Sequence, residues 1–291
     1  MSPPGGAKAG RFPLVLDQVG RVASPAKPRE TLRPQRHLRE AIKDASRQSV
    51  PQGLGLDSAL VRQRMVQRLR AEGIRCEPAF AAMAQLPRHL FVDTALATQA
   101  YEDTSLPIGH GQTISKPSVV ARMIELLFEG ASARAAGHLG RTLEVGTGCG
   151  YQAALLAQLA PRVVSIERLQ PLFDKASANL AKLTAGCLEH GRLAHGRQDH
   201  GRLDHVRLLY GDGMLGHAAG APFDSIIAAA GGDELPQPWL DQLAVGGRLV
   251  APMHRSGGRG QVLVVVDRHP TGLVRSEHEA VHFVPLKSGI V

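Results

Sequence analysis

The sequence has 291 residues, of which 43% are hydrophobic, only 4% are aromatic and three are cysteines. This length and composition allow one sizeable core built mainly from aliphatic side chains. No apolar run reaches the ~20 residues of a membrane span, and three scattered cysteines do not make a disulfide framework. Because no secretory signal pattern is visible either, we expect a cytoplasmic protein with no membrane partner.

The formal net charge of +8 is concentrated near the start of the chain. Residues 1–70 contain 14 Lys and Arg against 5 Asp and Glu, whereas the remaining 221 residues contain 20 against 21. A basic tail of this kind can contact RNA or an acidic surface, but a solvated tail that maintains solubility is the commoner role. Since the body of the chain is close to neutral, a nucleic-acid partner is not expected.

Residues 1–55 are rich in Pro, Gly and Arg and lack a sustained apolar period, which predicts a disordered or loosely ordered extension. A short helix over 38–47 is compatible with this segment. The ordered domain is expected over 56–291 and begins with three helices whose apolar residues repeat at helical spacing. The first follows a cap at Asp57–Ser58 and ends at Gly73, the second has Pro78 in its first turn and stops at Pro87, and the third runs from Pro117 to Gly130.

From Arg141 onward, short β-rich runs alternate with helical stretches. The β-rich runs are 142–145, 163–166, 206–209, 223–229 and 248–252, and helical stretches near 150–159, 170–183 and 236–243 lie between most of them. This alternation is typical of a parallel sheet with helices on both faces. Two more strands, at 261–266 and 280–286, are expected to close the sheet as an antiparallel hairpin. The predicted fold class is therefore α/β, with a Rossmann-like, doubly wound, mostly parallel seven-stranded sheet and an N-terminal helical extension.

A five-residue repeat occupies most of a predicted loop at 186–205. Its histidines are His190, His195, His200 and His205, and the first three are each followed by Gly-Arg. Histidine is a common metal ligand, but ligation needs fixed geometry and supporting hydrogen bonds, which a glycine-containing repeat does not offer. We therefore interpret the repeat as an expanded surface loop and expect no metal site.

The strongest local signal is the run Leu-Glu-Val-Gly-Thr-Gly-Cys-Gly at 143–150, which follows a predicted strand and opens a helix. Gly146, Gly148 and Gly150 let the backbone turn tightly and approach a ligand at the carboxyl edge of the sheet. The dinucleotide pattern G-x-G-x-x-G/A fits only from Gly148, two residues late relative to the strand. The acidic Glu144 also disfavours bound phosphates and suits a cationic group, such as the ammonium of a methionine moiety.

Two more carboxylates follow the next two predicted strands. Glu167 ends the second strand, where a carboxylate can accept hydrogen bonds from both hydroxyls of a ribose. Asp212 and Gly213 follow the third strand, at a place that suits the amino group of an adenine. Each carboxylate alone is more often a solvated loop residue, but together with Glu144 they occupy three successive strand ends. This series indicates one nucleoside-binding edge.

This series of motifs resembles the class I S-adenosylmethionine-dependent methyltransferases. A more specific resemblance lies upstream, at 106–117, where Leu-Pro-Ile-Gly-His-Gly-Gln-Thr-Ile-Ser-Lys-Pro is similar to the signature of protein-L-isoaspartate O-methyltransferases. The segments 86–92, 221–227 and 280–286 are similar to the same family. The resemblance therefore covers about 60–291, in the same order along the chain.

The sequence departs from the family pattern at two places. Lys116 stands where the family usually has Gln, which puts a cation beside the expected active centre. Gly231 and Gly232 stand where the family tends to have prolines, so a more mobile loop is expected there. The N-terminal extension and the histidine repeat fall outside the resemblance.

The resemblance implies methyl transfer from S-adenosylmethionine to the free α-carboxylate of L-isoaspartyl residues in age-damaged polypeptides. The ester then closes to a succinimide, which can reopen as normal aspartate. Catalysis is implied at Ser115, whose hydroxyl would hold the carboxylate, with a helix cap as its alternative role. The substrate residues implied are Gln112, Thr113 and Ile114. The cofactor residues implied are Ser118, Glu144, Gly146, Thr147, Gly148, Cys149, Gly150, Glu167, Arg168, Asp212 and Gly213.

Three other functions fit parts of the sequence. A class I methyltransferase that acts on RNA or a small molecule is disfavoured by the neutral body and by the absence of an Asn-Pro-Pro-Tyr-like motif at 228–232. A non-catalytic protein of the same fold would owe its inactivity to Lys116 and the two glycines. A metal-binding protein would act through the histidine repeat. A monomer is expected, because a repair enzyme must admit varied polypeptides.

Overall fold

The computed structural model describes residues 59–189, 203–255 and 260–291, all within a unit that spans Pro51–Val291. The expected extension, its short helix and most of the histidine repeat lie outside these residues. In the part that is described, no helix is long and apolar enough to cross a membrane. The same part contains no group of three or more His, Cys, Asp or Glu residues that could hold a metal ion.

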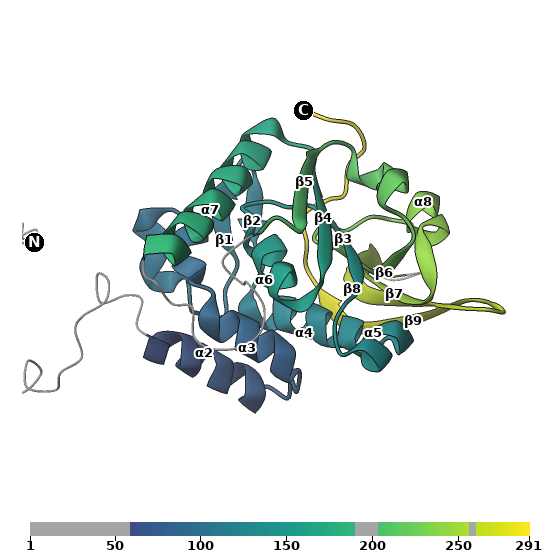
Figure 1. The fold of residues 1–291 in the computed structure, drawn as a ribbon, viewed down its shortest axis with the longest axis horizontal. Coiled ribbons are helices and arrows are strands. Elements are labelled where there is room, and N and C mark those ends of the chain that lie inside the picture. The colour runs from purple at the N-terminus through teal and green to yellow at the C-terminus, as the bar shows by residue number, and fades with distance from the viewer. Residues whose placement is uncertain (1–58, 190–202, 256–259) are drawn as a thin grey trace, which may run out of the picture. The chain divides into compact units, whose positions relative to one another are not determined.

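A seven-stranded sheet organises this unit (Figure 1). Its strands are β3 Arg141–Val145, β4 Arg162–Glu167, β5 Val206–Tyr210, β6 Phe223–Ala228, β7 Leu243–His254, β8 Gln261–His269 and β9 Gly272–Val281. They lie in the order β5-β4-β3-β6-β7-β8-β9, with β3 to β7 parallel and the last two strands added antiparallel. The chain turns to opposite sides of β3 in its two halves, so the predicted doubly wound, mostly parallel α/β fold is confirmed.

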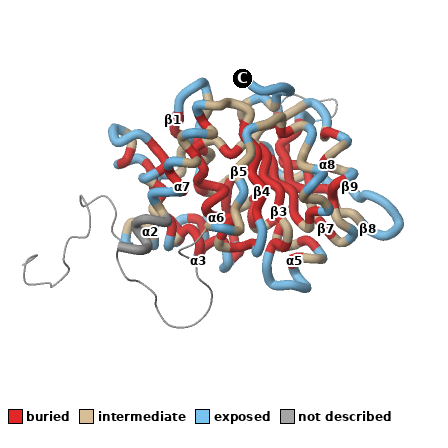
Figure 2. Tube along the Cα trace, turned by 45° about the horizontal axis from the view of Figure 1, so that its top comes forward, coloured by how far each residue is buried: buried red, intermediate tan, exposed pale blue. Residues whose placement is uncertain are grey.

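Helices cover both faces of the sheet, and they are α2 Ala59–Ala71, α3 Glu77–Gln85, α4 Pro117–Phe128, α5 Ala131–Ala136, α6 Tyr151–Leu159, α7 Gln170–Glu189 and α8 Gln237–Asp241. One apolar cluster joins α2, α3, α4, α6 and α7 to one sheet face, while Trp239 of α8 belongs to the cluster on the other. Neighbouring strand residues alternate between the two, as Val163 and Val164 do. Figure 2 shows the central strands as the most continuously buried part of the chain.

The three helices predicted before the sheet are present as α2, α3 and α4. Between α3 and α4 the chain forms short 3-10 helices, η2 Arg88–Phe91 and η3 Thr94–Gln99, and a hairpin of β1 Leu106–Gly109 and β2 Gln112–Ile114. The sequence pattern predicts no strand at this hairpin. In its turn, Gly109, His110 and Gly111 have φ values of 99°, 54° and 68°. A positive φ is uncommon for histidine, so this turn does not have the residue pattern that usually marks a hairpin in a sequence.

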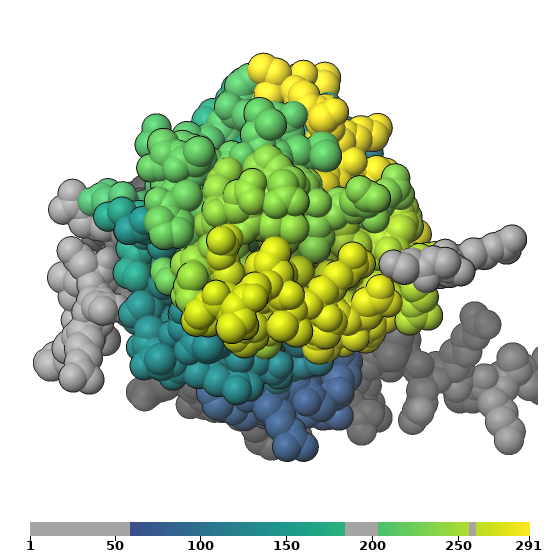
Figure 3. Space-filling model, turned by 90° about the vertical axis from the view of Figure 1, so that its right-hand side faces the viewer, coloured from purple at the N-terminus to yellow at the C-terminus, as the bar shows by residue number. Residues whose placement is uncertain are grey.

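The antiparallel edge differs from the prediction of a strand over 280–286. The strand β9 instead covers Gly272–Val281, and most of its side chains are exposed. Figure 3 shows the C-terminal part of the chain, in yellow, crossing this face of the molecule. An exposed edge strand has no continuous apolar run by which it can be predicted. The apolar residues at 283–286, on which the prediction relied, belong instead to the segment that follows the strand and leaves the sheet. Near α8, the strand β7 already begins at Leu243, within the predicted helix 236–243.

The segment that leaves the sheet is joined to the loop after β6. The Gly231 amide donates to the Val284 carbonyl at 2.8 Å, and the Leu286 amide donates to the Gly231 carbonyl at 2.7 Å. A Cβ on Gly231 would lie 2.3 Å from Nε2 of Gln261, so a larger residue there would require the Gln261 side chain to move. Backbone hydrogen bonds therefore join this loop to the C-terminal segment, and the expected greater mobility at Gly231 and Gly232 stays a prediction.

Candidate active site

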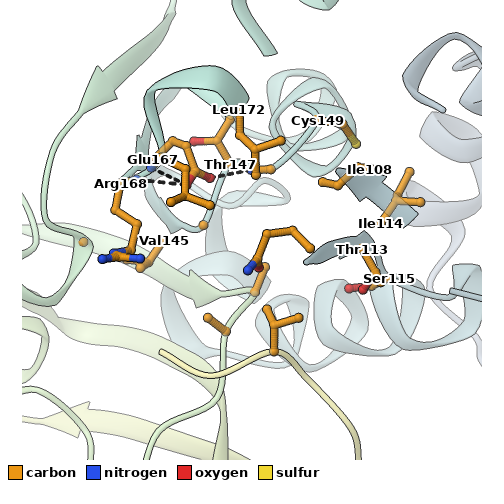
Figure 4. Close-up of a pocket in the computed structure, with 18 of the residues that line it drawn as sticks. Ile108, Thr113, Ile114, Ser115, Val145, Thr147, Cys149, Glu167, Arg168 and Leu172 are labelled. Carbon is orange, nitrogen blue, oxygen red and sulfur yellow. Dashed lines mark hydrogen bonds between the residues drawn. The ribbon is translucent and has the colours of Figure 1, made fainter. Parts of the chain in front are cut away.

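A cavity of about 390 Å³ lies at the carboxyl ends of β3 and β4, beside the β1–β2 hairpin (Figure 4). This volume is within the range of small-molecule sites. Its walls come from the glycine turn after β3, the end of β4, the hairpin and the segment 284–287. The predicted site residues that line it are Gln112, Thr113, Ile114, Ser115, Gly146, Thr147, Gly148, Cys149, Glu167, Arg168 and Gly213. The predicted residues that do not line it are Ser118, Glu144, Gly150 and Asp212.

The glycine turn brings backbone rather than side chains to the cavity. Gly146, Gly148 and Gly150 adopt φ 90°, 57° and 88°, a left-handed region that glycine enters without steric cost. A Cβ on Gly148 would lie 3.2 Å from Cδ1 of Ile108, so the hairpin packs closely onto the turn. Gly150 lies just outside the cavity as the N-cap of α6, against Ala176 of α7. The predicted turn is formed, and its first two glycines face the ligand space.

Glu167 joins the glycine turn to the start of α7. Its Oε2 accepts from the Gly148 amide at 2.8 Å, and its Oε1 accepts from the amides of Arg168 and Leu169 at 2.9 and 3.0 Å. The side chain is largely buried but lines the cavity, and Figure 4 shows these hydrogen bonds. Three backbone amides therefore fix the position of this carboxylate at the cavity wall. This is the place at which the sequence predicts a ribose.

Glu144 lies beneath the turn and not in the cavity. Its side chain is fully buried, and the Ser165 hydroxyl donates to it, while Ser165 is hydrogen-bonded in turn to Thr147 at 2.6 Å. Burial raises the pKa of Glu144 to about 8, partly opposed by the hydrogen bonds from Ser165 and Gln152. The carboxyl is therefore mostly protonated at pH 7. The expected contact with a cationic ligand group is corrected, because the alternation of β3 turns this side chain into the core.

Asp212 is also committed to the protein rather than to the cavity. Its Oδ1 accepts from the Met214 amide at 2.9 Å, and its Oδ2 accepts from the Gly289 amide at 2.6 Å. The neighbouring Gly213 does line the cavity. A Cβ on Gly213 would lie 2.5 Å from Cγ1 of Val145, so only glycine fits between the loop and β3. In this structure the third motif therefore contributes its glycine to the wall and its carboxylate to the loop behind it.

Ser115 lies at the other end of the cavity, directly after β2. Its carbonyl oxygen accepts from Nη2 of Arg88 at 2.7 Å, and its hydroxyl has no hydrogen-bonding partner among the described residues. The N-cap of α4 is Lys116, and the amide of Ser118 donates to Oδ1 of Asp103 at 2.8 Å. The start of the helix is thus capped by Asp103. The alternative role of Ser115 as a helix cap does not apply, and its hydroxyl is available to the cavity.

Two residues near Ser115 lie outside the cavity wall. The hydroxyl of Ser118 donates to Oδ2 of Asp103 at 2.8 Å, so Asp103 binds both the hydroxyl and the amide of this predicted cofactor residue. Lys116 is exposed and does not line the cavity. The cation that departs from the family pattern is therefore not part of the wall.

The segment 284–287 is a part of the cavity wall that was not predicted as a site from the sequence. The residues that follow this segment form hydrogen bonds with the loops after β4 and β5. The Gly289 amide donates to Asp212, and the Val291 amide donates to the Arg168 carbonyl at 2.8 Å. The family-like residues near the end of the sequence were the available signal, but an apolar run alone does not distinguish a strand from a wall segment.

These features together define a class of protein. A doubly wound sheet with a glycine turn after its first strand, a carboxylate after its second and an antiparallel edge is the architecture of a class I S-adenosylmethionine-dependent methyltransferase. Residues 60–290 match the family model described as protein-L-isoaspartate(D-aspartate) O-methyltransferase. The chain belongs to this family.

Curated relatives agree with this assignment, and a solved structure shares the fold. A protein-L-isoaspartate O-methyltransferase of Methylibium petroleiphilum is 60% identical over 282 residues, which cover 97% of each chain. One from Leptothrix cholodnii is 53% identical, over 97% of this chain and 95% of its own. A structure from Plasmodium falciparum, assigned as a protein-L-isoaspartate O-methyltransferase and bound to S-adenosyl-L-homocysteine, shares the fold with a TM-score of 0.60 at 23% identity, over 78% of this chain and 98% of its own.

Proposed function

We propose that this chain methylates the free α-carboxylate of L-isoaspartyl residues in damaged proteins, with S-adenosylmethionine as the methyl donor and Ser115 as the residue that holds the carboxylate. The observation that carries the proposal is a single cavity with two different ends. One end is formed by the glycine turn and Glu167, and the other presents the unpaired hydroxyl of Ser115. The family of the chain and its relatives at 60% and 53% identity support the same reaction.

The donor group fits the residues at the first end. Gly146 and Gly148 present bare backbone, and the carboxylate of Glu167 retains lone pairs that can accept from ribose hydroxyls. Gln152 lines the same wall, and its side-chain amide interacts with the buried Glu144. When bound, S-adenosylmethionine supplies a methyl group that is already activated by its positively charged sulfur.

The residues at the second end need only position the acceptor. A carboxylate with a pKa of about 3.5–4 is already ionised at neutral pH, so no general base is required. The Ser115 hydroxyl is a neutral donor that can orient one carboxylate oxygen without neutralising the other. The apolar side chains of Ile114 and Val120 line the cavity beside it and exclude water from the nucleophile. Rate enhancement then comes mainly from alignment of oxygen, carbon and sulfur.

We also propose that the enzyme acts in the cytoplasm. The thiols of Cys76 and Cys149 are free and buried. Burial raises the pKa of Cys76 to about 11, which keeps this thiol protonated and unreactive. Unpaired thiols are usual in a reducing compartment, which supports this location.

The proposed activity is tested by transfer of a labelled methyl group to two synthetic peptides that differ only in L-isoaspartate against L-aspartate. We expect base-labile label on the isoaspartyl peptide alone, because a methyl ester is hydrolysed by base and a methylated amine is not. Label on neither peptide, in a protein that binds S-adenosyl-L-homocysteine in calorimetry, would contradict the proposed acceptor while leaving the cofactor site intact. Equal label on both peptides would contradict the proposed selectivity.

A further inference from the structure

Arg88 is a buried cation directly behind the wall that contains Ser115. Its side chain is fully buried, Nε donates to the Ala100 carbonyl at 2.8 Å, and Nη2 donates to the Ser115 carbonyl at 2.7 Å. The guanidinium carbon lies 4.7 Å from the ring centre of Tyr151. Since both Ser115 and Tyr151 line the cavity, one layer of protein separates this charge from the ligand space.

No carboxylate within the described residues forms an ion pair with Arg88. The carboxylate of Asp103 acts electrostatically on Arg88, but both of its oxygens already accept hydrogen bonds from Ser118. Nη1 of Arg88 and the hydroxyl of Tyr151 are both buried and interact with each other, at a geometry short of a regular hydrogen bond. Burial lowers the pKa of Arg88, but a guanidinium remains charged at neutral pH.

A buried charge without a counter-ion costs free energy, and carbonyl groups and one aromatic face offset only part of that cost. In a weakly polarisable interior the field of the charge extends through one layer of side chains. The missing negative charge is what an anionic ligand group at Ser115 would provide.

We propose that Arg88 is a positioning and specificity-determining residue that holds the Ser115 backbone and favours a free carboxylate over a neutral group at this end of the cavity. This inference rests on the proposed function, because it assigns the negative charge to the isoaspartyl α-carboxylate. In the transfer step the carbon–sulfur bond breaks, its electron pair stays on sulfur, and a carbon–oxygen bond forms. The carboxylate becomes a neutral ester, so the attraction to Arg88 disappears and product release is favoured.

The role of Arg88 in binding predicts a particular kinetic pattern. Arg88→Gln removes the charge but keeps a hydrogen-bond donor near the Ser115 carbonyl. Because the acceptor still carries most of its negative charge in the transition state, the attraction acts on both states, and we expect KM for an isoaspartyl peptide to rise about tenfold and kcat to change by less than about threefold. The dissociation constant of S-adenosyl-L-homocysteine should stay within about twofold, since the cofactor end is untouched.

The decisive measurement is calorimetric binding of two peptides to the enzyme loaded with S-adenosyl-L-homocysteine, which prevents turnover. One peptide carries isoaspartate, and the other carries isoasparagine, its uncharged α-carboxamide. We expect the wild-type protein to bind the acid at least about tenfold more tightly than the amide. Arg88→Gln should bring this ratio near one, whereas Arg88→Lys should retain most of it. Arg268→Gln is the matched control, because Arg268 also donates to a carbonyl, that of Leu240, outside the cavity wall.

A folded Arg88→Gln protein that keeps the wild-type ratio would overturn the inference, and so would equal weakening of both peptides, which indicates a merely structural role. If the Gln variant does not fold, Arg88→Lys decides, because loss of the ratio despite a retained charge contradicts the proposal. Equal affinities of the wild-type protein for acid and amide also contradict it. A wild-type protein without methyl transfer to the isoaspartyl peptide would instead refute the proposed function itself.

Discussion

The two ends of the cavity are built from different parts of the fold. The cofactor end stands on the ends of buried central strands, and its contacts are largely backbone, as in the three amides that bind Glu167. The substrate end stands on a hairpin whose strands are four and three residues long, and it depends on the side chains of Ser115 and Arg88. In the proposed function, the first end is general to a class of enzymes, while the second carries the choice of acceptor.

The largest effect is expected at the substrate end, from Ser115→Ala. The variant should lose about 100-fold in turnover, as is usual when one orienting donor is removed, with cofactor affinity within about twofold. Steady-state kinetics with the isoaspartyl peptide measures the first quantity and calorimetry the second. Ser118→Ala is the matched control, because that hydroxyl is bound to Asp103 outside the cavity and its loss should leave turnover unchanged. Wild-type turnover in Ser115→Ala would remove this serine from the mechanism.

Gly213→Ala tests the dependence of the cofactor end on backbone. The added Cβ would lie 2.5 Å from Cγ1 of Val145, which forces a shift in either the loop or β3. We expect a loss of about 2 kcal/mol in the free energy of unfolding, measured with denaturant. Gly211→Ala, two residues earlier, is the control, because its Cβ would meet Cγ2 of Ile166 at an ordinary 3.8 Å. Equal stabilities of the two variants would show that the loop yields without cost.

Glu167→Gln tests the difference between the two ends of the cavity, because it changes the cofactor end alone. The amide keeps the shape of the side chain but loses the charge that accepts from backbone amides and, in the proposal, from ribose hydroxyls. The dissociation constant of S-adenosyl-L-homocysteine should rise about tenfold, while turnover at saturating cofactor remains near the wild-type value. An unchanged dissociation constant in calorimetry would contradict the assignment of Glu167.

The smallest effect on catalysis is expected from Glu144→Gln, within about twofold at pH 7, because a neutral amide replaces a carboxyl that is mostly neutral. The pH dependence of stability should change instead. In the folded protein the pKa is about 8, above the ordinary 4.5, so the folded state retains a proton that the unfolded state releases. Wild-type stability therefore contains a term that is lost as pH rises from about 4.5 to 8, and the variant lacks it.

Denaturant unfolding at pH 5 and pH 8 measures this term. The variant should gain stability relative to wild type as pH rises, and the gain should level off above about pH 8. Glu234→Gln is the control for loss of a carboxylate, because Glu234 is exposed. If the free energies of unfolding of Glu144→Gln and wild type changed in parallel with pH, Glu144 would not retain its proton in the folded protein.

Much of the fold could be predicted because its central strands are buried on both faces and leave continuous apolar runs in the sequence. The elements that were missed lack this signal. The strand β9 is exposed along most of its length, and the β1–β2 hairpin turns through a histidine with positive φ. Local pattern reports burial, and it reports little about short or solvated strands.

The site was predictable at the level of motifs and less so at the level of single side chains. Gly146 and Gly148 face the cavity as predicted, because the local sequence largely determines the backbone conformation of a glycine turn. Glu144 turns into the core, and Ser118 is captured by Asp103, 15 residues earlier in the chain. Arg88 was not singled out at all, since burial of a lone arginine depends on contacts distant in sequence. The orientation and hydrogen-bonding partners of a side chain depend on the tertiary structure, and the spacing of residues in the sequence does not determine them.

The exposed strand β9 has a consequence for an enzyme that handles damaged chains. An open sheet edge is a template onto which partly unfolded polypeptides can add as a further strand and start to aggregate. This edge carries Arg275, Glu277 and Glu279, all exposed. Charged side chains at such positions oppose uptake of a foreign strand. The enzyme can thus bind partly unfolded substrates at its cavity while its exposed sheet edge does not nucleate their aggregation.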